Sequence, residues 1–314
     1  MTMFSIDAPA LSRAFVDRSE DLRSPDRLAR SWRNAKVLLV SPGGHLPTAA
    51  EPDGLRLVFE GTARWGAAPP PGAVLLGRLD GADHWAVPYQ WPDSGPNAGP
   101  PAGGERADAD TIRAIGPLLA GDEAALATTA VALLAWHDAA GFCSRCGRPT
   151  VPDISGHTRT CPEGHQEFPR TDPAVIVLVH DGGDRMVMAR QPSWAPGRFS
   201  VLAGFAEAGE SLEATVLREI GEEVGLPVRD VQYLGSQPWP FPRSLMIAFA
   251  ARAPRGADLR PRPGEIEDAR WFSRAELRLL LDESKPAAGP VAGITLPGPV
   301  SIARRMVEGF VKAG

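Results

Sequence analysis

Short apolar segments alternate with turn residues through the first hundred residues of the chain. Val, Leu and aromatic residues are concentrated in segments 35–41, 55–61, 72–80 and 83–91. Such segments, bounded by Gly, Pro, Asp and Ser, predict four β-strands of an antiparallel layer. A run rich in Ala and Leu, 122–141, predicts a helix. The Pro- and Gly-rich stretch 92–110 predicts a flexible insertion in a loop.

The second half of the chain mixes strand-like and helix-like segments. Strands are predicted at 174–180, 186–191, 199–204, 231–237, 244–253 and 269–273. Helices are predicted at 211–224, where Gly225 and Pro227 stop the helix, and at 301–313. Strands and helices in this order predict an α/β sandwich.

Length and charge limit the classes of function. A chain of 314 residues can hold two domains. We expect an N-terminal β-rich domain (1–141), a cysteine-bearing segment (142–170) and a C-terminal domain (171–314). A net charge of −5 does not favour nucleic acid as the main partner. Neither a signal peptide nor an apolar run of membrane-spanning length is evident, so we expect a soluble cytoplasmic protein without a membrane partner.

Acidic residues in the predicted helix 211–224 share one face. Glu219, Glu222 and Glu223 stand at i, i+3 and i+4, and Arg218 lies four residues before Glu222, within reach of its carboxylate. In a cleft with an effective dielectric near 20, two carboxylates ~5 Å apart repel by roughly 3 kcal/mol, so a partly buried cluster requires cations. Carboxylate oxygens suit Mg²⁺ or Mn²⁺. The alternative, a solvated acidic face, is not excluded by the spacing alone.

The segment 142–170 carries all three cysteines of the chain. Cys143, Cys146, Cys161 and His165 form a C-x2-C-x14-C-x3-H set with the ligand types of a tetrahedral structural zinc site. His157 is a second candidate for the fourth ligand. A redox C-x-x-C and a knuckle without metal are the alternatives. The glycine after Cys146, the irregular Pro/Gly-rich setting and the third cysteine favour zinc.

A proline-rich array follows the acidic helix. The sequence SQPWPFPRS, residues 236–244, holds three prolines and two aromatic residues in nine positions. Such a loop is stiff, and it offers an apolar slot with Gln and Ser groups for orienting a ligand. A purely structural proline-rich loop is the alternative.

These motifs together resemble those of the Nudix hydrolase family. The pattern from Gly204 to Leu226 has seven positions fixed in type, which match the family without a gap. A chance match is roughly one in 10⁸ per start position. SQPWPFPRS resembles the signature of the NADH pyrophosphatase (NudC-type) branch, and segments 168–177 and 301–308 also resemble that branch. Two features depart from it: Cys161 and His165 replace a second C-x2-C, and 92–110 has no counterpart.

The resemblance implies a zinc-ribbon-like linker, a C-terminal Nudix α/β/α sandwich and a set of site residues. The catalytic residues would be Arg218, Glu219, Glu222 and Glu223. Glu219, Glu223, Glu265 and the Ala203 carbonyl would hold Mg²⁺ or Mn²⁺, with Glu267 as the substitute for Glu265. Glu222 would be a further ligand or a partner of Arg218. The substrate would contact Gln237, Pro238, Trp239, Pro240, Phe241, Pro242, Arg243, Ser244, Phe168, Phe205, Ala303 and Arg113.

The implied activity is hydrolysis of NADH or NAD⁺ to a nicotinamide mononucleotide and AMP. Members of this branch also remove NAD caps from RNA, and the resemblance implies a homodimer. A different class is a Nudix-fold sensor that binds NAD or ADP-ribose without hydrolysis. Such sensors tend to carry broken acidic patterns, and the pattern here is whole.

Overall fold

The computed structural model describes residues 5–89, 109–282, 284 and 289–314, and these form two compact units. Unit 1 combines the described part of 1–9 with 172–239 and 244–314. Unit 2 contains 10–171 and the short segment 240–243. The cysteine segment therefore belongs to unit 2, and the described beginning of the chain belongs to unit 1. The predicted insertion 92–110 lies outside the described residues except at its last two positions.

Unit 1 is built on a mixed six-stranded sheet. Its strands are β11 (Asp172–His180), β12 (Arg185–Arg190), β13 (Leu202–Phe205), β14 (Arg229–Trp239), β15 (Ser244–Arg252) and β16 (Asp268–Ser273). The order is β14-β15-β11-β12-β16, and β13 pairs with β11. β11 and β15 run parallel, whereas the other pairs are antiparallel. All six segments that the sequence predicted as strands of this half are strands.

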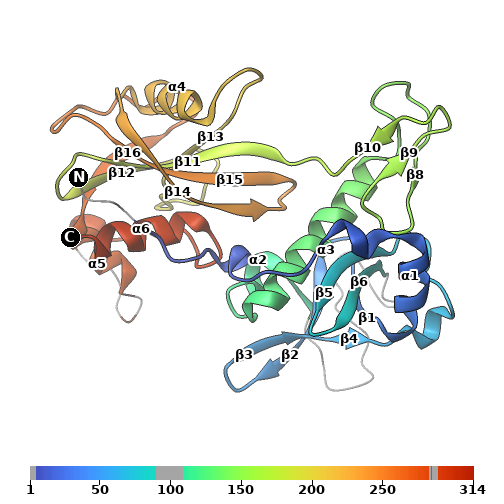
Figure 1. Ribbon diagram of the computed structural model, residues 1–314. Helices are drawn as coiled ribbons and strands as arrows, with labels where there is room; N and C mark the ends of the chain where they lie inside the picture. The colour runs from blue at the N-terminus through green and yellow to red at the C-terminus, as the bar shows by residue number, and fades with distance from the viewer. Residues whose placement is uncertain (1–4, 90–108, 283, 285–288) are drawn as a thin grey trace. The chain divides into compact units, whose positions relative to one another are not determined.

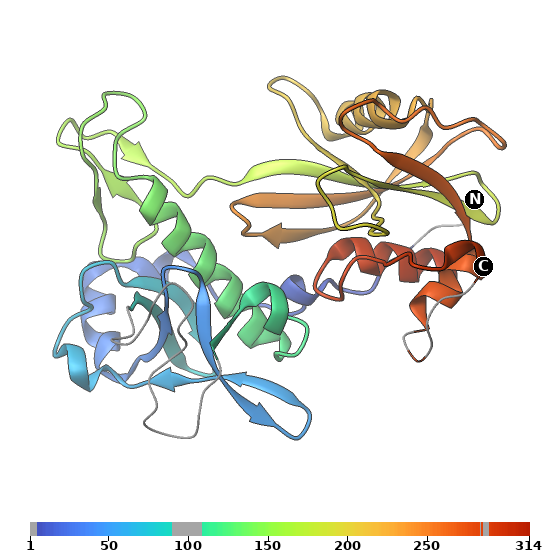
Figure 2. The same cartoon turned by 180° about the vertical axis from the view of Figure 1, so that it is seen from behind.

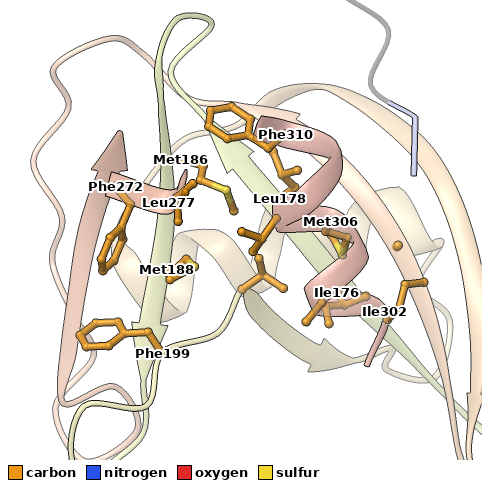
Figure 3. Packing of buried hydrophobic residues seen from close by; sticks show 14 of the residues in the cluster. Ile176, Leu178, Met186, Met188, Phe199, Phe272, Leu277, Ile302, Met306 and Phe310 are labelled. Atoms are coloured by element: carbon orange, nitrogen blue, oxygen red, sulfur yellow. The ribbon is translucent and has the colours of Figure 1, made fainter. Parts of the chain in front are cut away.

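Helices cover both faces of this sheet. α4 (Leu212–Val224) lies on one face, and α5 (Arg274–Leu281) and α6 (Ile302–Lys312) lie on the other (Figures 1 and 2). Alternate residues of β11 point to opposite sides, as the pleat requires. Val175 and Val177 pack in the core beneath α4. Ile176 and Leu178 pack with the methionines of β12 and with α6 (Figure 3).

Local signals define the ends of the helices in unit 1. The Ser211 hydroxyl accepts a hydrogen bond from the Ala214 N–H at 3.2 Å, which caps the start of α4. Gly225 adopts the left-handed conformation (φ 69°) that ends it. α5 begins with a capping box in which Ser273 and Glu276 bond each other's backbone N–H. This helix was not predicted from the sequence.

The described residues of unit 2 form β1 to β10 and three helices. The strands are β1 (Lys36–Val40), β2 (His45–Glu51), β3 (Gly54–Leu57), β4 (Phe59–Glu60), β5 (Val74–Leu79), β6 (Ala82–Pro88), β7 (Ala109–Thr111), β8 (Val151–Pro152), β9 (Arg159–Thr160) and β10 (Gln166–Glu167). The helices are α1 (Pro25–Ser31), α2 (Ile112–Ile115) and α3 (Gly121–Ala139). Short 3₁₀ segments lie at Ala10–Ser12, Glu20–Arg23, Trp32–Asn34, Thr62–Trp65 and Gly289–Val291, the last in unit 1.

The N-terminal layer differs from the expected antiparallel arrangement. β1 and β6 pair in parallel at the centre of the four-stranded layer. A parallel pair requires that the chain, after leaving β1, return to the end of the layer at which β1 began before it enters β6. β2, which was not predicted, pairs with β3 and β7 in a separate sheet. Trp32 and Trp85 meet edge to face at 5.4 Å in the core of the β1–β6 layer. Within the described ranges, no helix has the length and apolar character needed to cross a bilayer.

Candidate active site and metal centre

Helix α4 directs two of its carboxylates inward. Glu219 and Glu223, one helical turn apart, are 9% and 3% exposed, whereas the Glu222 side chain is 45% exposed. The buried pair therefore lies on the side of α4 that faces the sheet, and Glu222 lies at its border. The solvated acidic face considered from sequence is wrong for Glu219 and Glu223.

Glycine at position 204 permits the close approach of Glu219. A Cβ atom added to Gly204 would lie 2.0 Å from the Glu219 carboxyl carbon. Real Cβ atoms do not approach other atoms so closely, so only glycine admits this carboxylate here. Gly204 lies in β13, whose Ala203 is paired with Ile176 of β11. The Glu219 carboxylate of α4 thus packs directly against the backbone of β13.

Arg218 organises the acidic residues around it. Its guanidinium donates to Glu210 at 2.6 and 2.9 Å, to Glu219 at 2.9 Å and to the Phe205 carbonyl at 2.9 Å. It also lies 3.6 Å from Glu222. Hydrogen bonds from Arg218 lower the pKa of Glu210 to about 2. Arg218 therefore holds the Glu219 carboxylate against β13 from one side.

Of the two buried carboxylates, Glu219 pairs with Arg218, whereas Glu223 has no ion pair among the described residues. Burial, together with the charges of Glu219, Glu265 and Glu222, raises the pKa of Glu223 to about 8. Its Oε2 atom is buried and has no hydrogen-bond partner in the described ranges of the chain. Burial also raises the pKa of Glu219, against the opposing effect of Arg218. An orphaned carboxylate oxygen among negative charges fits a divalent cation that takes hard oxygen ligands.

Glu265 joins this electrostatic cluster and Glu267 does not. The charge of Glu265 contributes to the raised pKa of both buried glutamates. Glu267 instead pairs with Arg190. Arg262, which the sequence did not single out, lies 3.2 Å from Glu222 and 3.4 Å from Glu265 and so bridges them. No sequence motif marks this arginine. One of its partners, Glu222, lies 40 positions away, and the other, Glu265, lies in the same loop.

The SQPWPFPRS array forms the hairpin of β14 and β15. Pro238 and Trp239 pair with Leu245 and Ser244, and the tip spans Pro240–Arg243. In unit 2 the Arg113 guanidinium stacks over the Phe241 ring at 4.3 Å. Both residues, with buried Pro240, line a cavity of about 590 Å³. Pro242 and Arg243 are exposed.

Other expected substrate residues differ in accessibility. Phe168 and Phe205 are 60% and 57% exposed, so their rings are open to a ligand. Ala303 is buried at the start of α6. Gln237 is fully buried, and its amide donates to the Val300 carbonyl at 2.8 Å and accepts from the Ile302 N–H at 2.6 Å. The expected direct contact of this amide with substrate is therefore not supported, because both polar atoms already hold the beginning of α6.

The cysteine segment forms a compact cluster of ligand atoms. Ligand atoms of Cys143, Cys146, Cys161 and His165 all lie within 4.8 Å of one another. The Cys146 and Cys161 sulfurs are 3.7 Å apart, and Cys143 Sγ lies 3.6 Å from His165 Nδ1. A tetrahedral zinc ion separates two sulfurs by about 3.8 Å and a sulfur and a nitrogen by about 3.6 Å. The three cysteines are free thiols, and the set fits zinc.

His157, the other candidate for the fourth ligand, serves a different purpose. Its Nε2 atom hydrogen-bonds the Leu75 carbonyl of β5 at 2.8 Å. The loop around it also approaches β5 through the Leu75 N–H, which donates to the Ser155 carbonyl at 2.8 Å. The hydrogen bond of His157 thus stabilises the packing of the cysteine segment against the β1–β6 layer.

A glutamate-bearing helix against a mixed sheet, with an orphaned carboxylate oxygen and a separate Cys₃His cluster, defines the class of Nudix hydrolases with a zinc ribbon. Residues 170–292 match the NUDIX domain, and residues 138–165 match the NADH pyrophosphatase zinc ribbon domain. Over 311 residues the chain is 44% identical to the NAD-capped RNA hydrolase NudC of Mycobacterium bovis, covering 96% of this chain and 94% of that protein. The chain belongs to the Nudix hydrolase family.

Two further relatives are similar. The NAD-capped RNA hydrolase NudC of Deinococcus radiodurans is 38% identical over 281 residues, which cover 88% of this chain and 89% of that protein. The human mitochondrial NAD(P)H pyrophosphatase NUDT13 is 42% identical over 196 residues, 60% of this chain and 55% of that protein. The similarity to the NudC proteins therefore includes unit 2 as well as the Nudix domain.

Proposed function

We propose that this enzyme hydrolyses the pyrophosphate bond of NADH and NAD⁺ and removes NAD caps from RNA. Water cleaves one P–O bond of the pyrophosphate. The products are a nicotinamide mononucleotide and either AMP or an RNA with a 5′-monophosphate. The observation that carries the proposal is the buried Glu219–Glu223 pair with its orphaned oxygen, in a chain 44% identical to a NudC hydrolase over 96% of its length.

In this proposal two kinds of metal site serve different purposes. Glu219, Glu223, Glu265 and the Ala203 carbonyl hold Mg²⁺ or Mn²⁺, and Glu222 stands beside them. When bound, such a cation would supply charge neutralisation for the pyrophosphate and would lower the pKa of a water molecule. The Cys₃His set holds zinc, which is structural because four protein ligands leave no open position.

The chain's own residues prepare this site. Arg218 orients Glu219 through the 2.9 Å hydrogen bond and opposes the rise in its pKa that burial causes. Gly204 leaves the space that the carboxylate occupies. In unit 1 the exposed ring of Phe205 offers a stacking surface for a base or a nicotinamide. Phe168 and Arg113, which belong to unit 2, stay predicted substrate contacts. The homodimer and the cytoplasmic location stay predictions.

A direct assay separates hydrolysis from binding alone. The purified protein is incubated with Mg²⁺ or Mn²⁺ and with NADH, NAD⁺, ADP-ribose or NAD-capped RNA, and AMP or 5′-monophosphate RNA is quantified. Replacing Glu223 by Gln should lower turnover about 100-fold or more, because a ligand of the cation is lost. Glu213→Gln, on the exposed side of the same helix, is the matched control and should retain turnover.

Two outcomes would contradict the proposal. Full NADH turnover by the Glu223→Gln variant would show that the Glu223 carboxylate has no role in the reaction. Tight binding of NAD or ADP-ribose without any AMP release, at saturating Mg²⁺ and Mn²⁺, would support the sensor instead. The ratio of turnover on free NADH to that on capped RNA distinguishes the two substrate classes.

A further inference from the structure

Unit 1 contains a polar cavity that lies apart from the carboxylates of α4. Its volume is about 820 Å³, and its charged lining consists of Arg252, Arg255 and Arg274 together with the carboxylates of Asp184 and Asp230. His180 also lines it. A Gly182–Gly183 turn forms part of the wall. This volume lies in the range of sites for small molecules, about 300–1,000 Å³.

Three arginines converge on the diglycine turn from separate elements. A Cβ atom on Gly182 would lie 3.1 Å from Arg252 Cδ, at the end of β15. One on Gly183 would lie 3.3 Å from Asp181 Oδ1 and 3.4 Å from Arg255 Nη2, in the following loop. Arg274, the first residue of α5, donates to the Gly183 carbonyl at 3.0 Å. Side chains larger than hydrogen at these two positions would crowd the arginines, so the turn brings the guanidinium groups together.

The positive charges of this cavity are only partly neutralised. Asp230 pairs with Arg252 at 2.6 Å, and Asp184 lies 3.8 Å from Arg274. Among the described residues, Arg255 has neither a hydrogen bond nor an ion pair. The Nε–H of Arg252 is buried and has no acceptor within the part of the chain that the structure describes. The Arg255 guanidinium and the Arg252 Nε–H are therefore donors without a partner among the described residues, and such donors match the oxygens of an anion.

The cavity is separated from the catalytic carboxylates by the sheet. His180 ends β11 five residues beyond Val175, the partner of Gly204, which corresponds to about 16 Å along the strand. Arg274 begins α5, and Ala250 belongs to the core beneath α6, so the cavity opens on the α5–α6 face. Glu219 lies on the opposite face, with α4.

We propose that this cavity is a second anion site, which binds the phosphoryl group of a nucleotide. A tetrahedral phosphate presents oxygens in several directions, as guanidinium groups from three elements require, whereas a planar carboxylate presents only two. The phosphoryl group has two possible sources: a free mononucleotide such as AMP, or a backbone phosphate of RNA. The proposal does not depend on the hydrolytic activity, because the site uses none of its residues.

Binding is measured without divalent cations, in excess chelator, so that the carboxylates of α4 do not capture the ligand. The probes are inorganic phosphate, AMP and a short uncapped RNA with a 5′-hydroxyl. Arg255→Gln should weaken binding roughly three- to tenfold, since one charged contact is lost. Arg198→Gln removes the same charge from an exposed arginine of unit 1 that does not line the cavity, and binding should be unchanged. Thermal unfolding of both variants checks the fold.

An NMR titration of His180 localises the ligand. Burial and the charges of Arg252 and Arg274 lower its pKa, against the effect of Asp181, and a bound phosphate should raise it. If Arg255→Gln weakens the binding of phosphate and AMP, the natural ligand is a mononucleotide. If Arg255→Gln weakens the binding of RNA alone, the natural ligand is the phosphate backbone of RNA. Equal binding by Arg255→Gln and Arg198→Gln for all three probes, or an unmoved His180 pKa at saturation, overturns the proposal.

Discussion

Replacing Gly204 by alanine is expected to abolish turnover and to leave the fold intact. The added Cβ would lie 2.0 Å from the Glu219 carboxyl carbon and 2.2 and 2.4 Å from its oxygens. Since non-bonded carbons approach to about 3.5 Å, the carboxyl group must retreat by about 1.5 Å. Glu219 is a flexible side chain, so it moves and the backbone of β13 does not.

This displacement has separate consequences for activity and stability. A shift of about 1 Å at a catalytic group can cost about 100-fold in rate, so turnover should fall by at least that factor. The 2.9 Å hydrogen bond from Arg218 to Glu219 is lost, which lowers the free energy of unfolding by at most about 3 kcal/mol. The assays are AMP release from NADH at saturating Mg²⁺ or Mn²⁺ and denaturant-induced unfolding.

Gly221→Ala is the matched control in the same pattern. A Cβ atom on Gly221 meets no atom within 4 Å, and the residue lies inside α4. Alanine there should raise the free energy of unfolding by about 0.5–1 kcal/mol and leave turnover unchanged. If Gly204→Ala retains most of its turnover while folded, Glu219 is not needed at its position beside β13, and the reasoning fails.

Three further predictions concern other parts of the molecule. His165→Ala should lose the zinc that the purified protein carries, and His157→Ala should keep it, as measured by metal analysis; the opposite pattern would exchange their roles. Gln237→Ala should lower the free energy of unfolding by roughly 2–4 kcal/mol, since two buried backbone groups at the start of α6 lose partners; an unchanged value would contradict this. The folded pKa of Glu210, about 2, lies below its ordinary value of 4.5, so its pairing with Arg218 stabilises the fold above pH 4.5 and is lost as the pH falls towards 2. Glu210→Gln should therefore be less stable than the parent protein at pH 7 and equally stable near pH 2, and a pH-independent difference would refute this.

Much of unit 1 was predictable because its signals are local. The strand segments alternate or form short apolar runs, and α4 carries both a serine cap and a glycine end within its own sequence. The parallel pairing of β1 with β6 was not predictable, because apolar segments do not specify which distant segment lies beside them. α5 was missed as well, since its eight residues are few for a helical period.

In the candidate sites, too, the features set by local spacing were predictable and those set by distant residues were not. Glu219 and Glu223 share a face because a helix repeats every 3.6 residues, and the Cys₃His set follows from its spacing. The roles of Gln237 and His157 were not readable, because their partners at Ile302 and Leu75 lie 65 and 82 residues away. Glu265 and Glu267 were both candidates from the sequence, and the structure distinguishes them because Glu265 meets Arg262 whereas Glu267 meets Arg190.

The sequence by itself determined the family, the acidic helix with its spacing and the ligand types of the zinc cluster, because these are properties of short segments. Only the tertiary structure decided that Glu223 is buried without a partner, that Gly204 is required by Glu219, and that Arg252, Arg255 and Arg274 surround one turn. The physical reason is that burial and charge depend on atoms brought together from distant parts of the chain. Spacing along one helix describes only which residues share its face.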